Sequence, residues 1–267
     1  LMITLLAGIR GKNILVKYLP QLEKEYQFWM KGVEGLNETT SGLHRVVRVA
    51  DGEILNRYWD ENNTPRPESY REDVELAHES KQDPKEIYRH LRAGAESGWD
   101  FSCRWFKDKT QFTSIDTTDI IPVDLNCLLV HLEQTIADAY WLKEDSEASK
   151  EYKSLAEKRK QAIQKYCWDT DLRFFVDYDR KEKKQKQLFT LAGLFPLAFG
   201  LATKEQSKQV AAIVNEKFLK SGGVVTTLET TGQQWDAPNG WAPLQWMTIT
   251  ALENYGHHEL AAEIAKC

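Results

Sequence analysis

Four tryptophans in this sequence are followed directly by an aspartate. The pairs are Trp59-Asp60, Trp99-Asp100, Trp168-Asp169 and Trp235-Asp236. Carboxylates beside aromatic rings suit glycoside hydrolysis, in which one acid protonates the glycosidic oxygen and a second carboxylate activates water or attacks the sugar. A partly apolar wall raises the pKa of the acid. Most aspartates in such pairs cap helices or lie on the surface, so the pairs alone leave the chemistry open.

Motifs for other chemistries are absent. The sequence has no Gly-rich phosphate loop, HExxH, Cys–His nucleophile pattern or GxSxG elbow. The adjacent His257 and His258 predict a surface turn, because neighbours in a chain do not face the same way. The four cysteines are widely spaced, which favours free thiols over a zinc site or a disulfide framework. We therefore expect no metal and no cofactor.

Composition limits the partners. The net charge of −5 and the pI near 5.8 argue against nucleic acid and against an anionic membrane surface. No stretch reaches the roughly 18 to 20 apolar residues that span a bilayer. Nine Trp, ten Tyr and ten Phe suit either an aromatic core or a carbohydrate site, where a sugar face lies on an indole.

The most unusual stretch is residues 233–243. It places two indoles and one carboxylate in a loop that contains Pro and Gly, directly before an expected helix at 241–255. Asn239 is the expected N-cap of this helix, and Pro243 falls in its first turn. Such a loop can form a site, and it can equally be a Trp-rich helix cap packed into a core.

The hydrophobic spacing predicts a mainly helical chain. A buried helix is expected at the start of the chain. The next helix, at 12–31, is expected to be divided at Pro20 and to end at Gly32. A hairpin with a two-residue turn at Asp51-Gly52 joins strands at 43–49 and 53–59. Residues 174–178 are expected to be extended, and the charged run 180–186 to be a solvated turn. The expected helices are 12–31, 68–80, 84–97, 122–143, 146–167, 188–202, 204–219, 241–255 and a final amphipathic piece.

Helical hairpins joined by long loops with Trp and Gly predict an all-α fold of the α/α-toroid type, with a small β-hairpin insertion. The loops at one end of such a toroid form a cleft. Strand content is too low for an α/β sheet. We expect residues 1–267 to form a single domain.

Residues 234–243, Gln-Trp-Asp-Ala-Pro-Asn-Gly-Trp-Ala-Pro, resemble the second signature of the trehalases of glycoside hydrolase family 37. Residues 65–70, 91–100 and 121–126 resemble the same family in the same order, and the similarity runs through nearly the whole chain. The resemblance implies an (α/α)6 toroid that hydrolyses α,α-trehalose to two glucose molecules with inversion and without a metal.

Site residues also follow from the resemblance. Asp100 resembles the general acid of the family, and Trp235 an aromatic wall of the sugar site. Asp236 is expected to have a supporting role. The positions that resemble substrate-binding residues are Arg66, Pro67, Glu68, Gly98, Trp235, Asp236 and Trp241.

The sequence also departs from the family. Its first signature, a Pro-Gly-Gly-Arg-Phe segment, is absent, and so is the Glu-bearing segment with a Gly-rich run that holds the general base. We therefore expect a partial toroid that is inactive alone, with the general base outside these residues. A sugar-binding remnant without hydrolysis and a toroid glycosidase acting on glucans remain alternatives. The expected partner is the disaccharide trehalose, and the expected state is a monomer; the compartment stays open between cytoplasm and periplasm or export.

Overall fold

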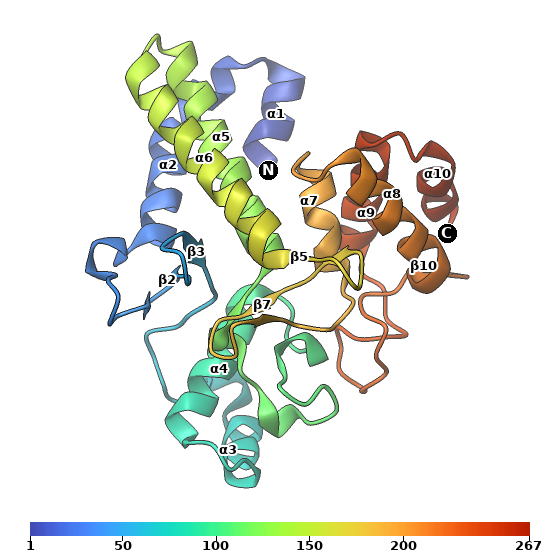
Figure 1. The fold of residues 1–267 in the computed structure, drawn as a ribbon. Helices are drawn as coiled ribbons and strands as arrows, with labels where there is room; N and C mark the ends of the chain where they lie inside the picture. Colours follow the sequence, from blue (N-terminus) through green and yellow to red (C-terminus); the bar gives the residue numbers. More distant parts are fainter. The chain divides into compact units, whose positions relative to one another are not determined.

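The computed structural model describes residues 1–267 and is mainly helical, with a few short antiparallel sheets. The chain divides into two compact units (Figure 1). The first unit comprises residues 1–56 and 124–165, and the second comprises residues 57–123 and 166–267. None of the helices combines the length and apolar character that a bilayer crossing requires.

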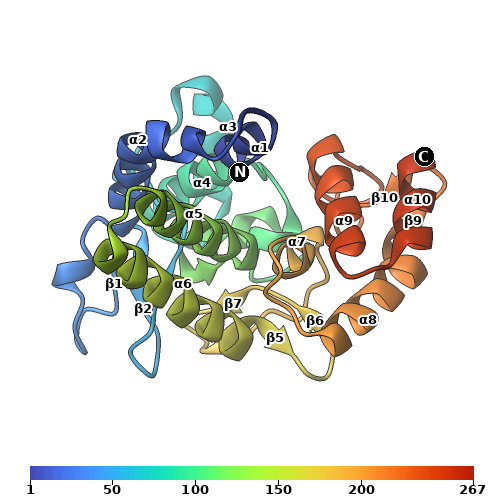
Figure 2. The same cartoon turned by 90° about the horizontal axis from the view of Figure 1, so that it is seen from above.

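The first unit is a group of helices. It contains α1 (Met2–Arg10), α2 (Asn13–Met30) and most of α5 (Val123–Leu142) and α6 (Ser146–Cys167). The long helices α5 and α6 lie side by side in both views (Figures 1 and 2), as the predicted helical hairpin requires. The core of the unit includes Leu15, Leu19, Ile136 and Ala139.

Two predictions for the first helices are wrong. Pro20 does not break α2, which continues through it to Met30. Pro20 lies on the exposed side of the helix, where solvent can hydrate the carbonyl that its missing N–H leaves without a donor. The first helix is not buried either, because only Ala7 is enclosed while Met2 and Ile9 are each 82% exposed.

The predicted hairpin forms, with a different turn. Strands β2 (Val46–Arg48) and β3 (Ile54–Asn56) pair antiparallel, and β1 (Gly42–Leu43) adds to β2 through a turn at His44. Val49 donates to the carbonyl of Glu53, so the loop has three residues instead of the expected two. Gly52, with φ 93°, takes the left-handed conformation that a three-residue loop of this kind needs.

The second unit carries the remaining elements. Its helices are α3 (Tyr70–Glu79), α4 (Pro84–Ser97), α7 (Phe195–Ala198), α8 (Lys204–Ile213), α9 (Ala242–Asn254) and α10 (His258–Lys266). Its strands are β4 (Ile120–Ile121), β5 (Trp168–Asp169), β6 (Phe174–Phe175), β7 (Tyr178–Asp179), β8 (Lys184–Gln185), β9 (Leu219–Lys220) and β10 (Gly223–Val224). They form the antiparallel sheets β4-β7-β8, β5-β6 and β10-β9.

Helix lengths differ most from prediction in the last third of the chain. The expected helix at 188–202 shortens to a 3₁₀ turn (Leu191–Leu194) and α7, and Thr190 forms an antiparallel β-bridge with Thr227 instead of joining the helix. The helix expected at 204–219 ends as α8 at Ile213 and continues as one π-helical segment (Val214–Phe218). The other helices lie close to their predicted positions.

The N-cap of α9 is Trp241, and Asn239 was a wrong prediction for that role. The Asn239 amide instead donates to the Gln234 carbonyl at 3.2 Å within the preceding loop. Pro243 does lie in the first turn of α9, as expected.

Candidate active site

The end of α4 positions Asp100. Asp83 caps the start of this helix by accepting from the Lys85 N–H, and Gly98 ends it with φ 75°. This left-handed residue turns the chain away from the helix axis, as predicted, and delivers Trp99 and Asp100 into a loop. A Cβ atom placed on Gly98 would meet no atom within 4 Å, so the space beside it is open.

Asp100 is exposed, and its carboxylate makes no hydrogen bond or ion pair within the chain. Its two neighbours are more enclosed. Trp99 is 5% exposed, and Phe101 is half-buried. The carboxylate therefore projects from a backbone whose flanking aromatic side chains are packed.

Arg66 precedes a 3₁₀ turn (Pro67–Ser69) in the extended conformation predicted from Pro67. Its Nε and Nη2 donate to the Asp73 carboxylate, with Nη2 2.7 Å from Oδ1, and its backbone N–H donates to Oδ2 at 2.8 Å. Nη1 makes no hydrogen bond within the chain, so one edge of the guanidinium remains available. Pro67 and Glu68 are exposed beside it, and Glu68 makes no hydrogen bond with Asp100.

Trp235 contacts the Asp100 loop through both its backbone and its ring. Its N–H donates to the Phe101 carbonyl at 3.0 Å. Its indole stacks on Trp99, with centroids 5.3 Å apart, and on Trp241, with centroids 4.4 Å apart. The indole N–H of Trp241 donates to the Gln234 carbonyl at 3.2 Å. Three indoles from two loops thus form one stacked group.

Asp236 is fully buried, so its carboxylate faces protein and not an open cleft. It accepts from Ser102 Oγ at 2.7 Å and from the Cys103 N–H at 2.9 Å. The hydroxyls of Thr227 and Thr231 also donate to it. The carboxylate therefore ties residues 102–103, just after Asp100, to the loop that carries Trp235. Burial and the nearby Asp236 charge together raise the pKa of the Cys103 thiol well above its ordinary value.

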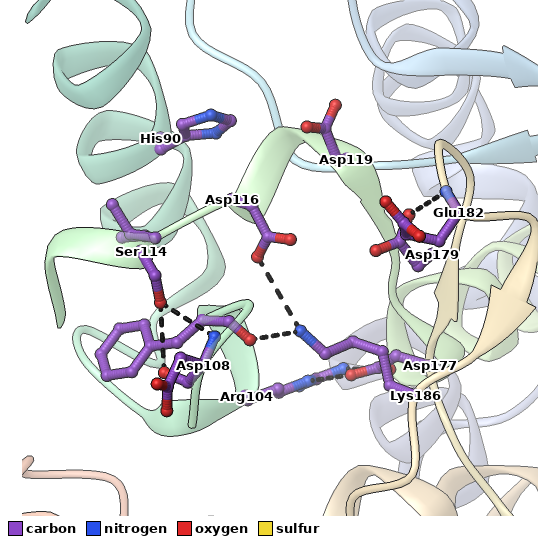
Figure 3. Close-up of polar contacts among 12 residues, drawn as sticks. His90, Arg104, Asp108, Ser114, Asp116, Asp119, Asp177, Asp179, Glu182 and Lys186 are labelled. Carbon is purple, nitrogen blue, oxygen red and sulfur yellow. Dashed lines mark hydrogen bonds and ion pairs between the residues drawn. The ribbon is translucent and has the colours of Figure 1, made fainter. Parts of the chain in front are cut away.

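A buried ion pair beneath the loop was not found from the sequence. Arg104 Nε donates to Asp177 Oδ2 at 2.7 Å, and both side chains are almost fully enclosed (Figure 3). The Arg104 guanidinium lies 4.5 Å from the ring centroids of both Trp99 and Trp105. Asp177 also accepts from the Val123 N–H at 2.9 Å. The available signal was Arg104 between Trp99 and Trp105 in the sequence, and its partner is 73 residues away.

Two further buried groups lie near this ion pair (Figure 3). Asp116 has no hydrogen-bond partner on either oxygen, and Lys186 Nζ is 3.8 Å from Oδ1. Burial raises the pKa of Asp116 to about 6. His90 Nδ1 accepts from the Thr118 N–H, and burial lowers the pKa of this imidazole to about 4.

The other two Trp-Asp pairs have structural contacts. Asp60 pairs with Arg92, with Oδ2 3.0 Å from Nε. Asp169 is buried and accepts from the N–H groups of Asp171 and Leu172 in the turn between β5 and β6. Neither carboxylate has the exposed, unpartnered setting of Asp100.

The cysteines agree with the prediction of free thiols, with Cys267 exposed and the other three buried. No group of three or more His, Cys, Asp or Glu side chains has metal-binding geometry. The candidate site is the group formed by Asp100, Arg66, Trp99, Trp235 and Trp241. Asp73, Phe101, Arg104, Asp177 and Asp236 support these groups.

Known proteins resemble this chain over almost all its length. The periplasmic trehalase of Xanthomonas axonopodis pv. citri (strain 306) is 46% identical over 266 residues, which are 99% of this chain and 46% of that protein. The periplasmic trehalase of Citrobacter koseri is 47% identical over 264 residues, 98% of this chain and 46% of that protein. The chain thus spans about half the length of the curated relatives it matches.

Solved structures agree on the fold. The neutral trehalase Nth1 from Saccharomyces cerevisiae superimposes with a TM-score of 0.72 at 26% identity, covering 96% of this chain and 50% of that one. A GH63 mannosylglycerate hydrolase from Thermus thermophilus, at 14% identity and a TM-score of 0.60, shares the fold and covers 96% of this chain and 60% of that one. These likenesses confirm the predicted α/α-toroid class. The sequence model described as Trehalase matches residues 1–267, and the chain therefore belongs to the trehalase family.

Proposed function

We propose that the protein hydrolyses α,α-trehalose to two glucose molecules with inversion, and that Asp100 is the general acid. The observation that carries the proposal is an exposed, unpartnered Asp100 carboxylate on a loop held against the Trp235 signature of a trehalase-family chain. The proposed substrate is a neutral disaccharide, and no nucleic acid, membrane or cofactor is part of the proposal.

In this mechanism Asp100 gives its proton to the oxygen between the two glucose units. A second carboxylate, on the opposite face of the sugar, activates a water, and the two carboxyl groups lie ~6.5–9.5 Å apart to leave room for it. We propose that this base belongs to a segment outside these 267 residues. We therefore expect the 267 residues by themselves to bind trehalose without turnover.

The remaining site residues are proposed to bind the sugar. The free Nη1 of Arg66 can donate to a hydroxyl while Asp73 fixes the rest of the guanidinium. The open space beside Gly98 lets a ligand approach the backbone closely. The indoles of Trp235 and Trp241 supply an aromatic wall, and Pro67 and Glu68 are exposed at the Arg66 turn.

The test is Asp100→Asn in the longest natural polypeptide that contains these residues. We expect glucose release from trehalose to fall by ~10²–10⁴-fold, the contribution that is typical of general acid catalysis. Calorimetry should show trehalose binding unchanged within about threefold, because the size of the side chain is kept. Asp60→Asn is the matched control from another Trp-Asp pair and should retain turnover. Full turnover by Asp100→Asn would exclude Asp100 as the acid.

The alternatives give different outcomes with the same reagents. Trehalose binding by the wild type without glucose release indicates a sugar-binding protein without hydrolysis. Faster release from maltose than from trehalose indicates a glucan-directed glycosidase. We further propose that the protein is a monomer, which size-exclusion chromatography with light scattering tests directly.

A further inference from the structure

Phe101 connects the separate segments of the candidate site. Its carbonyl accepts the Trp235 N–H at 3.0 Å, and its ring lies under the Arg66 guanidinium at 4.9 Å from Cζ to centroid. It also follows Asp100 directly in the chain. We propose that Phe101 is the positioning residue that orients the Asp100 carboxyl group relative to Arg66 and Trp235. This inference rests on the proposed function of Asp100.

The ring of Phe101 has a defined place between three groups. Besides Arg66, it packs on Phe112, with centroids 4.9 Å apart. On its other side lies Gly94 of α4, where a Cβ atom would be only 2.6 Å from Phe101 Cε1. Real Cβ atoms do not approach so closely, so glycine at position 94 makes room for the ring. The end of α4 and the Asp100 loop are thereby fitted to each other.

The partners of Phe101 are held without its ring. Arg66 keeps its hydrogen bonds to Asp73, and Trp235 keeps its stacking on Trp99 and Trp241. Loss of the ring leaves the Trp99 carbonyl bonded to Trp105 Nε1 and the Cys103 N–H bonded to Asp236, but it removes the side-chain packing that holds the residue next to Asp100 against Arg66 and α4. The expected consequence is a misplaced acid beside a substrate site that still binds, and so a lower kcat with little change in KM.

The first variant is Phe101→Leu in the longest natural polypeptide that contains these residues, compared with the wild type and with Phe101→Tyr in the same polypeptide. A displacement of a reacting group by about 1 Å can cost about 100-fold in rate, so we expect Phe101→Leu to lower kcat by about 10–100-fold. KM for trehalose should stay within about threefold, because the contacts that bind trehalose equally in the ground state and the transition state are kept. Phe101→Tyr keeps the ring face under Arg66 and should restore kcat to within about threefold of the wild type.

Phe106→Leu is the matched control. Phe106 lies in the same loop and packs on Phe112 at 5.1 Å between centroids, yet it does not contact Arg66. It is 2% exposed, so its loss should lower the free energy of unfolding by about 1–2 kcal/mol through poorer packing. Its kcat should remain close to that of the wild type. An equal fall of kcat in Phe106→Leu and Phe101→Leu would reduce Phe101 to a packing residue and overturn the proposal.

A second variant, Gly94→Ala, tests the proposal if Phe101→Leu does not fold. Gly94→Ala keeps Phe101 and forces its ring to shift, while the new alanine favours the helix. It should reproduce the kcat loss at nearly constant KM. A Gly94→Ala enzyme with wild-type kcat contradicts the proposal as directly as an active Phe101→Leu enzyme does.

A crystal structure of Phe101→Leu gives a result that does not depend on turnover. The inference predicts a displaced Asp100 beside unmoved Arg66 and Trp235 side chains, and an unmoved Asp100 overturns it. If the wild type releases no glucose from trehalose, the proposed function fails, and this structural comparison still decides whether Phe101 positions Asp100.

Discussion

Three aspartates of the second unit differ mainly in the surroundings of their carboxylates. The Asp100 carboxylate is exposed without a partner, that of Asp236 is buried with several donors, and that of Asp116 is buried without a hydrogen bond, 3.8 Å from Lys186 Nζ. The sequence distinguishes them little, since each is an aspartate near aromatic residues in a loop. Their chemistry follows from burial and donors, so each substitution to asparagine should have a different effect.

Asp116→Asn should stabilise the protein above pH 6. Burial raises the pKa of Asp116 from 3.8 to about 6, so the folded state resists ionisation and loses stability as the pH rises from about 4 to 6. Asparagine removes that cost. We expect a gain of up to about 3 kcal/mol at pH 8 and almost none below pH 4, from about 1.4 kcal/mol per pKa unit. Urea unfolding at both pH values measures it; an equal gain at both would contradict the assignment. The His90 contribution cancels in the difference between variant and wild type.

Asp236→Asn should loosen the loop that carries Asp100. An amide places a donor against the Thr and Ser hydroxyls and the Cys103 N–H, so at least one of them loses its acceptor. We expect a loss of about 2–4 kcal/mol in the free energy of unfolding. Amide hydrogen exchange at Cys103 should become faster. Asp169→Asn, a buried loop aspartate between β5 and β6, should destabilise the protein while leaving exchange at Cys103 slow.

At the scale of elements, the end of α4 and the start of α9 position the residues of the candidate site. α4 ends at Gly98 and delivers Asp100, while the loop before α9 delivers Trp235 and ends at Trp241. The two ends meet through indole stacking and one backbone hydrogen bond. The proposed aromatic wall is therefore formed by indoles from both loops. The loss of one indole should change both the affinity for substrate and the packing between the loops.

Trp235→Leu should weaken trehalose binding by about 10–100-fold, as the loss of a tryptophan at the centre of a binding site commonly costs about 2 kcal/mol or more. Calorimetry in the Asp100→Asn background measures this without turnover. Trp246→Leu is the control, because Trp246 is 42% exposed on α9 and is not part of the indole stack. Its affinity should stay within about twofold of the parent. Equal losses in the two variants would mean that Trp235 does not contact the sugar.

Elements with uninterrupted periodicity could be predicted from the sequence. The spacing of apolar residues gave α6 at residues 146–167, and the Gly98 stop gave the end of α4. Helix ends and caps were predicted wrongly where a contact between residues outside the local segment determines the structure. Thr190 pairs with Thr227 in a β-bridge within the expected helix at 188–202, and the Asn239 amide donates to Gln234 where capping of α9 was expected. A single sequence contains the residues of such contacts but not their pairing.

At the scale of the whole molecule, the site residues come from positions 66 to 241 and all belong to the second unit. The family resemblance pointed to Asp100, Arg66 and Trp235, and the structure connects them through Phe101. The supports were not predictable, because Asp236 and Ser102 are 134 residues apart and Arg104 and Asp177 are 73 apart. Asp73, in contrast, is only seven residues from Arg66, which it holds.

The charges around the site favour a neutral substrate. Arg66 is paired with Asp73 and Arg104 with Asp177, while Glu68 and Asp100 are exposed carboxylates without cationic partners, in a chain of net charge −5. Trehalose carries no charge, so kcat/KM should change by less than about twofold between about 50 and 500 mM salt, where screening of charged ligands would be strong.

A phosphorylated disaccharide is the informative comparison. Its dianionic group meets uncompensated carboxylates, so we expect inhibition at least about tenfold weaker than trehalose binding, and stronger inhibition as salt screens the repulsion. Tighter binding of the phosphorylated sugar at low salt would show that a cationic group of the protein faces the substrate. Arg66 is the cation at the site with an uncommitted nitrogen, so in that case its pairing with Asp73 would have to open on binding.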